Sequence, residues 1–517
     1  MKKTITLISL FAFWLAVMPA AAFAGPTSIR VTPPAPKIAD TERQAELAKR
    51  RAAVAAAMPD KSLLIMFSAE PKLYTNDVDY VYRQENNLYY LTALKQDGVT
   101  LVMTKDRANV NEMLFLPKRV PVREAWEGKM YSREQAANIS GINNLVDSSE
   151  REAFLQSVKG KKAFASADGK VSIAAMPATV VLLLPESAQD GDGAREFRVE
   201  NEFSKELAGY KVENAQPIFT ELRHIKSPYE LKLLQHAIDI TTEAQMRSMA
   251  TVGRAQWEYQ VHAEVEYTFR RRNADFWGYP SIVGCGSNAT TLHYVESQGE
   301  VKPGQLLLMD VGAEYEHYTA DVTRTYPVNG KFTREQAEIY QIVYDAQEAA
   351  AKATKPGATI QQVSAAADVV MKEGLFKLGL ITDKTGNQFK RWYIHGLGHW
   401  LGMNVHDVGR YGAQLKAGMV FTNEPGIYIR DDVFANLPDT PENKAFIEKV
   451  RPAYEKYKNI GVRIEDDMLV TDTGSEWMTK NLPRSIADIE AFMAVGPSQV
   501  PLSTNGMGGS IFFERAG

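Results

Sequence analysis

The sequence predicts two domains, an α/β domain followed by an α+β domain. Its 517 residues exceed what one ordinary hydrophobic core holds. Between residues 63 and 212, short apolar runs alternate with helical patterns, which is typical of an α/β domain. After residue 217, pairs of helical segments alternate twice with hairpin-like segments, which indicates an α+β domain with a trace of internal duplication.

The first 24 residues have the layout of a secretory signal peptide. Lys2 and Lys3 precede an apolar stretch, and Ala22-Phe23-Ala24 provides a small-residue cleavage site. The apolar stretch is too short for a comfortable membrane span, although an uncleaved anchor is the alternative. We expect cleavage before Gly25, no lipid anchor because no cysteine follows the site, and an exported protein, periplasmic or secreted, with no further membrane attachment.

The expected N-terminal domain covers residues 40–216. Residues 25–39 contain three prolines and predict a linker. A helix is expected over residues 41–58, with Asp40 as its cap and Pro59 beyond its end. Apolar runs predict buried strands at residues 63–67, 99–103, 113–116 and about 180–184.

The expected second domain covers residues 217–494. Ser227 and Glu230 form the sequence pattern of a capping box at the start of a long helix, and Thr333 and Gln336 repeat it. A further helix is expected over residues 360–378. The glycine- and proline-rich residues 495–517 predict a flexible tail.

Charge and cysteine content exclude several kinds of protein. The net charge of −4 provides no basic field, so nucleic acid is an unfavourable partner. Cys285 is the only cysteine of the chain. An intrachain disulfide and a cysteine-based zinc site are therefore excluded.

Residues 306–325 have the composition of an antiparallel hairpin. If the turn is centred on Tyr315 and Glu316, Asp310 lies directly opposite Asp321. Two like charges in that position repel each other, and burial adds a desolvation cost. A bound cation would remove both costs, so the hairpin predicts a metal site.

Three further segments place polar side chains among apolar ones. Residues 395–407 contain three of the eight histidines, Glu424 ends an apolar run, and alternation places Glu465 on one face with Arg463. Any one of these groups could be a core histidine or half of an ion pair. Four carboxylates and one imidazole together favour two divalent cations, Mn²⁺ first, with Co²⁺, Zn²⁺ or Fe²⁺ as replacements. The expected ligands are Asp310, Asp321, His399, Glu424 and Glu465.

These stretches resemble the metallopeptidases of pita-bread fold, in the branch of Xaa-Pro aminopeptidase (aminopeptidase P) and prolidase. The resemblance covers nearly all of residues 40–494. It implies an N-terminal α/β domain of creatinase type and an α+β pita-bread catalytic domain. The motifs that carry it are residues 308–312, 320–327, 395–406, 423–426 and 463–467.

The resemblance implies a role for each site residue. Asp321 and Glu465 would bridge the two ions, with Asp310 on one ion and His399 and Glu424 on the other. Glu424 would also transfer the proton during catalysis. Further implied roles are carbonyl-facing donors for His293 and His406, the proline pocket for His395 and Tyr428, support of the carboxylates near the substrate for Arg463, and the leaving-peptide side for Tyr89.

The resemblance implies hydrolysis of the bond between an N-terminal residue and a following proline, by a homodimer or homotetramer. One alternative is a prolidase that cuts only Xaa-Pro dipeptides, and another is a non-catalytic binding protein of the same fold. The chain departs from the family in a charged insertion over residues 431–459. We expect it to contain a helix over residues 441–450, stopped by Pro452, and to lie over the cleft or at a subunit contact.

Overall fold

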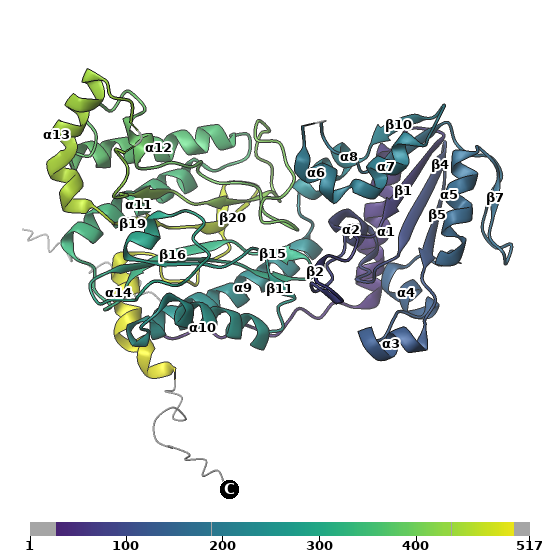
Figure 1. Ribbon diagram of the computed structural model, residues 1–517, viewed down its shortest axis with the longest axis horizontal. Coiled ribbons are helices and arrows are strands. Elements are labelled where there is room, and N and C mark those ends of the chain that lie inside the picture. Colours follow the sequence, from purple (N-terminus) through teal and green to yellow (C-terminus); the bar gives the residue numbers. More distant parts are fainter. Residues whose placement is uncertain (1–26, 188, 436, 501–517) are drawn as a thin grey trace, which may run out of the picture.

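The computed structural model describes residues 27–187, 189–435 and 437–500, and Figure 1 shows two domains side by side. The predicted signal peptide and residues 501–517 of the predicted tail lie outside the described residues. The N-terminal domain is built on a six-stranded mixed sheet in the order β10-β9-β1-β4-β5-β6. Its strands are β1 (Ser62–Phe67), β4 (Thr100–Asp106), β5 (Asn109–Leu116), β6 (Leu145–Asp147), β9 (Thr179–Leu182) and β10 (Lys211–Asn214).

Helices cover both faces of this sheet. Along β1, Leu63 and Ile65 pack with Phe154 and Phe203 of the helices on one face, whereas Leu64 packs toward the opposite face. The predicted runs are therefore confirmed as buried strands. The helices are α1 (Asp40–Ala57), α2 (Asn86–Thr92), α3 (Pro121–Glu127), α4 (Arg133–Ser140), α5 (Arg151–Lys159), α6 (Gly191–Glu196), α7 (Arg198–Lys205) and α8 (Gln216–His224). The short hairpins are β2 (Leu73–Thr75) with β3 (Val78–Asp79) and β7 (Phe164–Ala165) with β8 (Ser172–Ile173).

The predicted cap of α1 is wrong by one residue. The N-cap position is Ala39, which has no side-chain hydrogen bond to the helix. Asp40 is the first helical residue, and its carboxylate accepts a hydrogen bond from Arg43 Nη2 at 2.7 Å. An acidic side chain in the first turn still favours the helix through its dipole.

The C-terminal domain consists of two helix pairs and short antiparallel sheets. In Figure 1 its strands run between α9 and α10 below and α11 and α12 above. The helices are α9 (Pro228–Thr251), α10 (Glu258–Arg271), α11 (Arg334–Ala353), α12 (Ile360–Lys377), α13 (Pro441–Tyr457) and α14 (Ile486–Val495). The strands are β11 (Phe276–Trp277), β12 (Ile282–Cys285), β13 (Leu306–Val311), β14 (Ala313–Tyr315), β15 (Tyr318–Thr319), β16 (Val322–Pro327), β17 (Val420–Asn423), β18 (Gly426–Tyr428), β19 (Gly461–Arg463), β20 (Asp466–Val470) and β21 (Ser475–Trp477).

Local helix signals are confirmed in this domain. Ser227 and Glu230 form a reciprocal capping box at the start of α9, and Thr333 and Gln336 form another at the start of α11. Each helix pair is followed by a three-stranded sheet, β12-β13-β16 in the first half and β17-β20-β21 in the second. None of the helices among the described residues is long and apolar enough to cross a bilayer.

The predicted register of the central hairpin is wrong by two residues. Asp310 lies opposite Thr323, not opposite Asp321. The turn is centred on Glu316 and His317, whose φ angles of 48° and 66° place both residues in the left-handed region. Asp321 therefore lies between β15 and β16, one step outside the regular ladder. A shift of two residues keeps the same face, so both aspartates still face one cavity.

The insertion helix is longer than predicted. α13 runs through Pro452 to Tyr457 because its last turns bury aromatic side chains in the core of the domain. The Tyr454 ring lies 4.7 Å from the Phe434 ring, and its hydroxyl donates to the Asp431 carbonyl at 2.9 Å. α13 lies at the end of the domain that is remote from the N-terminal domain, so it does not lie over the interdomain side (Figure 1).

The described part of the predicted linker is bound to the C-terminal domain. Thr32 is buried, and both its backbone N–H and its hydroxyl donate to Glu243 Oε2 of α9, at 2.7 and 2.6 Å. Gln499, near the last described residue, accepts from the Ile29 N–H and donates to the Thr27 carbonyl. Residues 27–32 therefore form a strap across this domain before the chain enters α1.

Candidate active site

One cavity of about 480 Å³ brings most of the predicted site residues together. This volume lies within the range of small-molecule and peptide sites. All five predicted metal ligands line it, and so do three of the predicted substrate-facing histidines and Arg463. The lining residues are Tyr279, Pro280, Ile282, Leu292, His293, Val295, Asp310, Asp321, His395, Gly396, Gly398, His399, Val405, His406, Glu424, Arg463 and Glu465.

The ends of short strands place the five predicted ligands. Asp310 lies near the end of β13, and Asp321 lies just before β16. Glu424 follows β17 directly, and Glu465 lies between β19 and β20. His399 lies in the irregular segment ahead of β17, where its backbone N–H donates to Thr422 Oγ1 at 3.1 Å.

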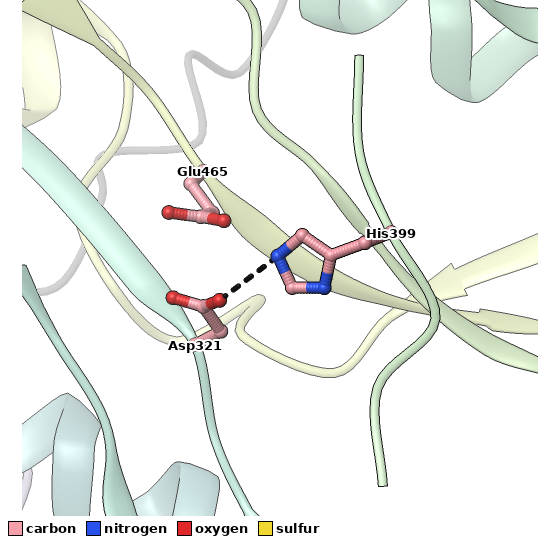
Figure 2. Close-up of side chains that lie close together, drawn as sticks. All are labelled: Asp321, His399 and Glu465. Atoms are coloured by element: carbon pink, nitrogen blue, oxygen red, sulfur yellow. Dashed lines mark ion pairs between the residues drawn. The ribbon is translucent and has the colours of Figure 1, made fainter. Parts of the chain in front are cut away.

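Three of these side chains form a compact group. One donor atom from each of Asp321, His399 and Glu465 lies within 4.8 Å of the others. Figure 2 shows a ring nitrogen of His399 directed at Asp321, with Glu465 on the same side. His399 Nε2 lies 3.2 Å from Asp321 Oδ2 and 3.4 Å from Glu424 Oε1. The Glu424 carboxylate is therefore adjacent to the same nitrogen.

The carbonyl group of Trp400 determines which ring nitrogen of His399 carries a proton. Its Nδ1 lies 3.1 Å from the Trp400 carbonyl, which can only accept a hydrogen bond. Nδ1 therefore carries a proton, and Nε2 faces the carboxylates. A metal-binding histidine is commonly oriented in this way, by a hydrogen bond from its other nitrogen.

Tyr279 joins the two aspartates, a role that the sequence did not suggest. Its hydroxyl is hydrogen-bonded to Asp310 Oδ1 at 2.6 Å and to Asp321 Oδ1 at 2.5 Å. Tyr279 lies in the irregular segment between β11 and β12, where a glycine and a proline flank it. Burial and the two carboxylates raise the pKa of Tyr279 well above its ordinary range, so its hydroxyl stays protonated as a donor.

The carboxylates carry more negative charge than their surroundings compensate. Burial and the Asp310 charge raise the pKa of Asp321, and burial with the Asp321 charge raises the pKa of Glu465 well above its ordinary range. Burial raises the pKa of Glu424 to about 7. Burial opposes the protonation of His399, but Asp321 and Glu424 outweigh it and raise the pKa of this histidine to about 9. The raised pKa values of the three carboxyl groups and of His399 all indicate an excess of negative charge in this buried site.

The donor set fits divalent cations. Four carboxylates face one guanidinium, that of Arg463, and a single imidazole, so the cavity has an excess of negative charge that divalent cations would compensate. Oxygen-rich ligands without thiolates suit hard or borderline cations. Asp467 adds to the buried acidity: its Oδ2 accepts from the Asp321 N–H at 3.3 Å, and its Oδ1 has no hydrogen-bond partner among the described residues.

Arg463 supports the carboxylates from behind. It donates to Asp310 Oδ2 at 2.5 Å, to Thr323 Oγ1 at 3.0 Å and to the Tyr428 hydroxyl at 2.9 Å. The Thr323 hydroxyl in turn donates to Glu465 Oε2 at 2.6 Å. Arg463 therefore holds Asp310 directly and Glu465 through the Thr323 hydroxyl.

His395 lines the cavity and is hydrogen-bonded to Tyr428. The Tyr428 hydroxyl lies 2.8 Å from His395 Nε2, and His395 Nδ1 lies 2.8 Å from the Gly396 carbonyl. Burial and the Arg463 charge lower the pKa of His395 to about 3, so the ring is neutral. Tyr428 itself is behind His395 and does not line the cavity.

His293 and His406 face the cavity from two separate loops. The His406 ring packs edge-on against the His399 ring at 4.3 Å. Burial and the neighbouring His399 lower the pKa of His406. Both histidines can therefore reach a substrate beside the carboxylates.

Tyr89 lies outside the cavity. It is buried in α2, where its ring stacks on His317 at 3.8 Å and its hydroxyl donates to Glu316. These partners belong to the turn of the central hairpin. The structure therefore places Tyr89 at the contact between the domains and not among the residues that line the cavity.

Two family models match the chain. The model described as metallopeptidase family M24 matches residues 232–472. The model described as the aminopeptidase P N-terminal domain matches residues 47–164. The two matches fall on the two domains described above. All five predicted metal ligands lie within residues 232–472, the match to the M24 model.

Curated relatives match over most of their length. An Xaa-Pro aminopeptidase of Haemophilus influenzae is 35% identical over 457 residues, which cover 87% of this chain and 97% of the relative. An Xaa-Pro aminopeptidase of Escherichia coli is 33% identical over 465 residues, 88% of this chain and 98% of the relative. Human Xaa-Pro aminopeptidase 3 is 31% identical, covering 83% of this chain and 80% of the relative.

Solved structures agree with the fold. Aminopeptidase P from E. coli with the inhibitor Pro-Leu matches with a TM-score of 0.74 and 31% identity over 90% of this chain and all of that chain. A zinc-substituted form of the same enzyme in complex with product matches with the same TM-score and identity, over 89% of this chain. The creatinase-type and pita-bread assignments are thereby confirmed. The chain belongs to metallopeptidase family M24 and, with its aminopeptidase P N-terminal domain, is an enzyme of the Xaa-Pro aminopeptidase branch.

Proposed function

We propose that this enzyme hydrolyses the peptide bond between an N-terminal residue and a following proline. The observation that carries the proposal is the convergence of Asp310, Asp321, His399, Glu424 and Glu465 on one cavity lined by apolar side chains. Its relatives named Xaa-Pro aminopeptidase support the same substrate class. All five predicted metal ligands are present in the cavity, which disfavours a non-catalytic binding protein.

The same five residues would hold two divalent cations, and we propose Mn²⁺ as the native ion. When bound, such cations supply Lewis acidity, which lowers the pKa of a water molecule and polarises a carbonyl group. Oxygen-dominated ligands favour Mn²⁺, while Co²⁺, Zn²⁺ and Fe²⁺ are replacements. Metal analysis of the protein purified without added metal would identify the ion and its stoichiometry.

Glu424 is placed to move a proton. Thr422 Oγ1 donates to Glu424 Oε1 at 3.0 Å, which orients the carboxylate toward the cavity. A carboxylate held within reach of the reacting atoms can act as a general base. Glu424 would take the proton of the attacking water and pass it to the proline nitrogen.

His293 and His406 would stabilise the charge that develops on the carbonyl oxygen. Both line the cavity beside the carboxylates, so an N–H of either ring can donate to that oxygen as its charge grows. Such a donor contributes most in the transition state, when the oxygen charge is largest.

Proline is recognised by shape, because its tertiary amide has no N–H for a peptidase to bind. Ile282, Leu292 and Val295 provide an apolar wall, and the neutral His395 provides a flat surface without a charge. Peptides longer than Xaa-Pro are the proposed substrates, with a prolidase as the alternative. The hydrolysis rates of Gly-Pro-Pro-Ala, Gly-Pro and Gly-Ala-Pro-Ala would separate the two and test the requirement for proline.

The expected effect of Glu424→Gln is loss of turnover by a factor of 100 or more, because the amide cannot take a proton. The measurement is release of the N-terminal residue from Gly-Pro-Pro-Ala. Thr471→Val, a change in the turn beyond β20, serves as control. Near-normal turnover by Glu424→Gln would contradict the proposal.

We further propose an exported homodimer or homotetramer. The signal-like residues 1–24 support export, and mass spectrometry of the mature protein should give an N-terminus at Gly25. Exposed apolar side chains support self-association: Trp126 is 87% exposed, and Leu73 and Tyr74 of the β2–β3 hairpin are both more than 60% exposed. Light scattering coupled to size-exclusion chromatography would measure the assembly.

A further inference from the structure

The loop of residues 400–407 carries His406 to the cavity, and the buried side chain of Asp407 anchors this loop to Arg223 and Lys226. The Asp407 side chain is 1% exposed. Its Oδ1 accepts from Arg223 Nη2 at 2.5 Å, and its Oδ2 accepts from Lys226 Nζ at 3.2 Å. The anchor is therefore a buried, charge-assisted contact directly next to His406 in the chain.

Both cations come from the segment that connects the two domains. Arg223 lies in the last turn of α8, and Lys226 lies between α8 and α9. The other nitrogen of the same guanidinium, Nη1, donates to Asn87 Oδ1 of α2 at 2.7 Å. A continuous chain of contacts thus runs from the N-terminal domain through Arg223 to Asp407.

Residues 83–87 of the N-terminal domain hold the loop at two more points. Asn86 Nδ2 donates to Asn404 Oδ1 at 2.7 Å, and Arg83 Nη2 donates to the Met403 carbonyl at 2.8 Å. The loop also closes tightly on its anchor, because a Cβ at Gly402 would lie 2.1 Å from Asp407 Oδ2. The turn has little room to shift while these contacts are intact.

We infer that Asp407 is a positioning residue for His406, and that the N-terminal domain sets the position of His406 through Asn87 and Arg223. The inference rests on the proposed function, in which His406 donates to the carbonyl oxygen. His406 packs on His399, and its neighbour Asp407 holds the loop through its buried side chain and through a backbone hydrogen bond to the Trp400 carbonyl. A displacement of about 1 Å at such a donor can reduce turnover by about 100-fold.

The first test is a double-mutant cycle on Gly-Pro-Pro-Ala, with Asp407→Asn and His406→Ala. Asp407→Asn should lower kcat by at least tenfold and change KM by less than threefold. In the His406→Ala background, the same change should lower kcat by less than twofold, because the positioned group is already absent. Equal losses in both backgrounds, or an unchanged kcat, would overturn the inference.

A matched control separates positioning from loss of stability. Glu243 is also a buried carboxylate that accepts from a guanidinium, that of Arg272, but it lies outside the cavity. Glu243→Gln should lower Tm and leave kcat within twofold of the parent enzyme. If Asp407→Asn fails to fold, Asn87→Ala takes its place, with an expected threefold loss of kcat that again disappears in the His406→Ala background.

A spectroscopic readout keeps this inference separable from the proposed function. In the protein labelled with ¹³C at histidine Cε1, the His406 signal is assigned as the one that His406→Ala removes. Asp407→Asn should shift or broaden this signal, whereas Glu243→Gln should not. If the parent enzyme failed to cleave Xaa-Pro peptides, the proposed function would fall while this result still decided the position of His406. An unmoved His406 signal would overturn the inference.

Discussion

The Tyr279 hydroxyl holds together two carboxylates that repel each other. It is hydrogen-bonded to Asp310 and Asp321 and carries no charge itself. Arg463 neutralises part of the charge on Asp310, but the structure shows no equivalent cation at Asp321 apart from His399. The geometry of the pair therefore depends on an uncharged donor.

Tyr279→Phe should weaken metal binding by about 10- to 100-fold, the usual effect of removing a group that orients metal ligands. The reason is that both aspartates lose the shared contact with the Tyr279 hydroxyl that fixes their orientation. Titration of the metal-free protein with Mn²⁺, followed by calorimetry, measures the change.

Tyr326→Phe is the control for this substitution, since within the described residues the buried Tyr326 hydroxyl is hydrogen-bonded only to the Met309 sulfur, at 3.8 Å. It should bind Mn²⁺ as the parent does. Equal affinities for the two variants would contradict the role given to Tyr279.

The acidic site should also couple stability to pH. Burial raises the pKa of Glu424 from its ordinary 4.5 to about 7. Between these values the folded metal-free protein binds more protons than the unfolded chain, so this group destabilises the fold as the pH rises through that window. Bound cations replace the protons and reverse the effect.

The increase in Tm caused by Mn²⁺ should therefore be larger at pH 8 than at pH 5.5. Thermal unfolding with chelator and with Mn²⁺ at both pH values gives the two differences. Taking the difference at each pH cancels titrations elsewhere in the protein. The same increase at both pH values would show that protons do not compete for the site.

Sequence reasoning pointed to the five acidic and histidine side chains that line the cavity and to Arg463, but not to Tyr279 or Asp407. These residues lie in short motifs next to apolar runs, and such motifs can be recognised from the sequence alone. Tyr279 and Asp407 act through partners 42 and 184 positions away in the chain, Asp321 and Arg223. Only the folded chain brings such pairs together.

At the level of single elements, α13 shows that tertiary burial can outweigh a proline. Pro452 lacks an N–H and its ring crowds the preceding turn, at a cost of about 3 kcal/mol in a helix interior. The helix nevertheless continues, because Tyr454 and Tyr457 are buried beyond it. Local propensity alone predicted a stop at this point.

Pro452→Ala should therefore raise the free energy of unfolding by about 1–3 kcal/mol. Chemical denaturation provides the measurement. Pro441→Ala is the matched control: this proline lies in the first turn of α13, where its missing N–H costs nothing, and its replacement should give no gain. A gain of the same size at both positions would mean that the helix interior is not the cause.

Helix starts were predictable because a capping box needs only residues three apart. The hairpin register was not, because it depends on which two residues adopt positive φ. Glu316 and His317 do so here, although neither is a glycine or an asparagine. The Tyr89 ring stacks on His317 and its hydroxyl bonds to Glu316, so the N-terminal domain supports this turn.

At the scale of the whole molecule, the two domains share a hydrophobic core. Leu88 and Leu91 of α2 pack in one cluster with Leu401 and Met403 of the active-site loop. The existence of two domains was readable from length and pattern. Their contact was not, because no local signal marks which faces meet.

The strap of residues 27–32 also belongs to this scale. A chain shortened to start at Pro33 should have a lower Tm than one that starts at Gly25. The expected loss in free energy of unfolding is about 2 kcal/mol, for the buried hydrogen bonds to Glu243. The kcat of the shortened chain should be unchanged, since the strap does not line the cavity. Thermal unfolding and turnover of both chains test this, and an unchanged Tm would show that the strap is dispensable.

The strap also orders events in time. Thr27 and Ile29 precede their partner Gln499 by 472 and 470 positions, so these contacts cannot form until residue 499 has been synthesised. The strap therefore closes after the residues between its two partners have been made, which makes it a late step of folding.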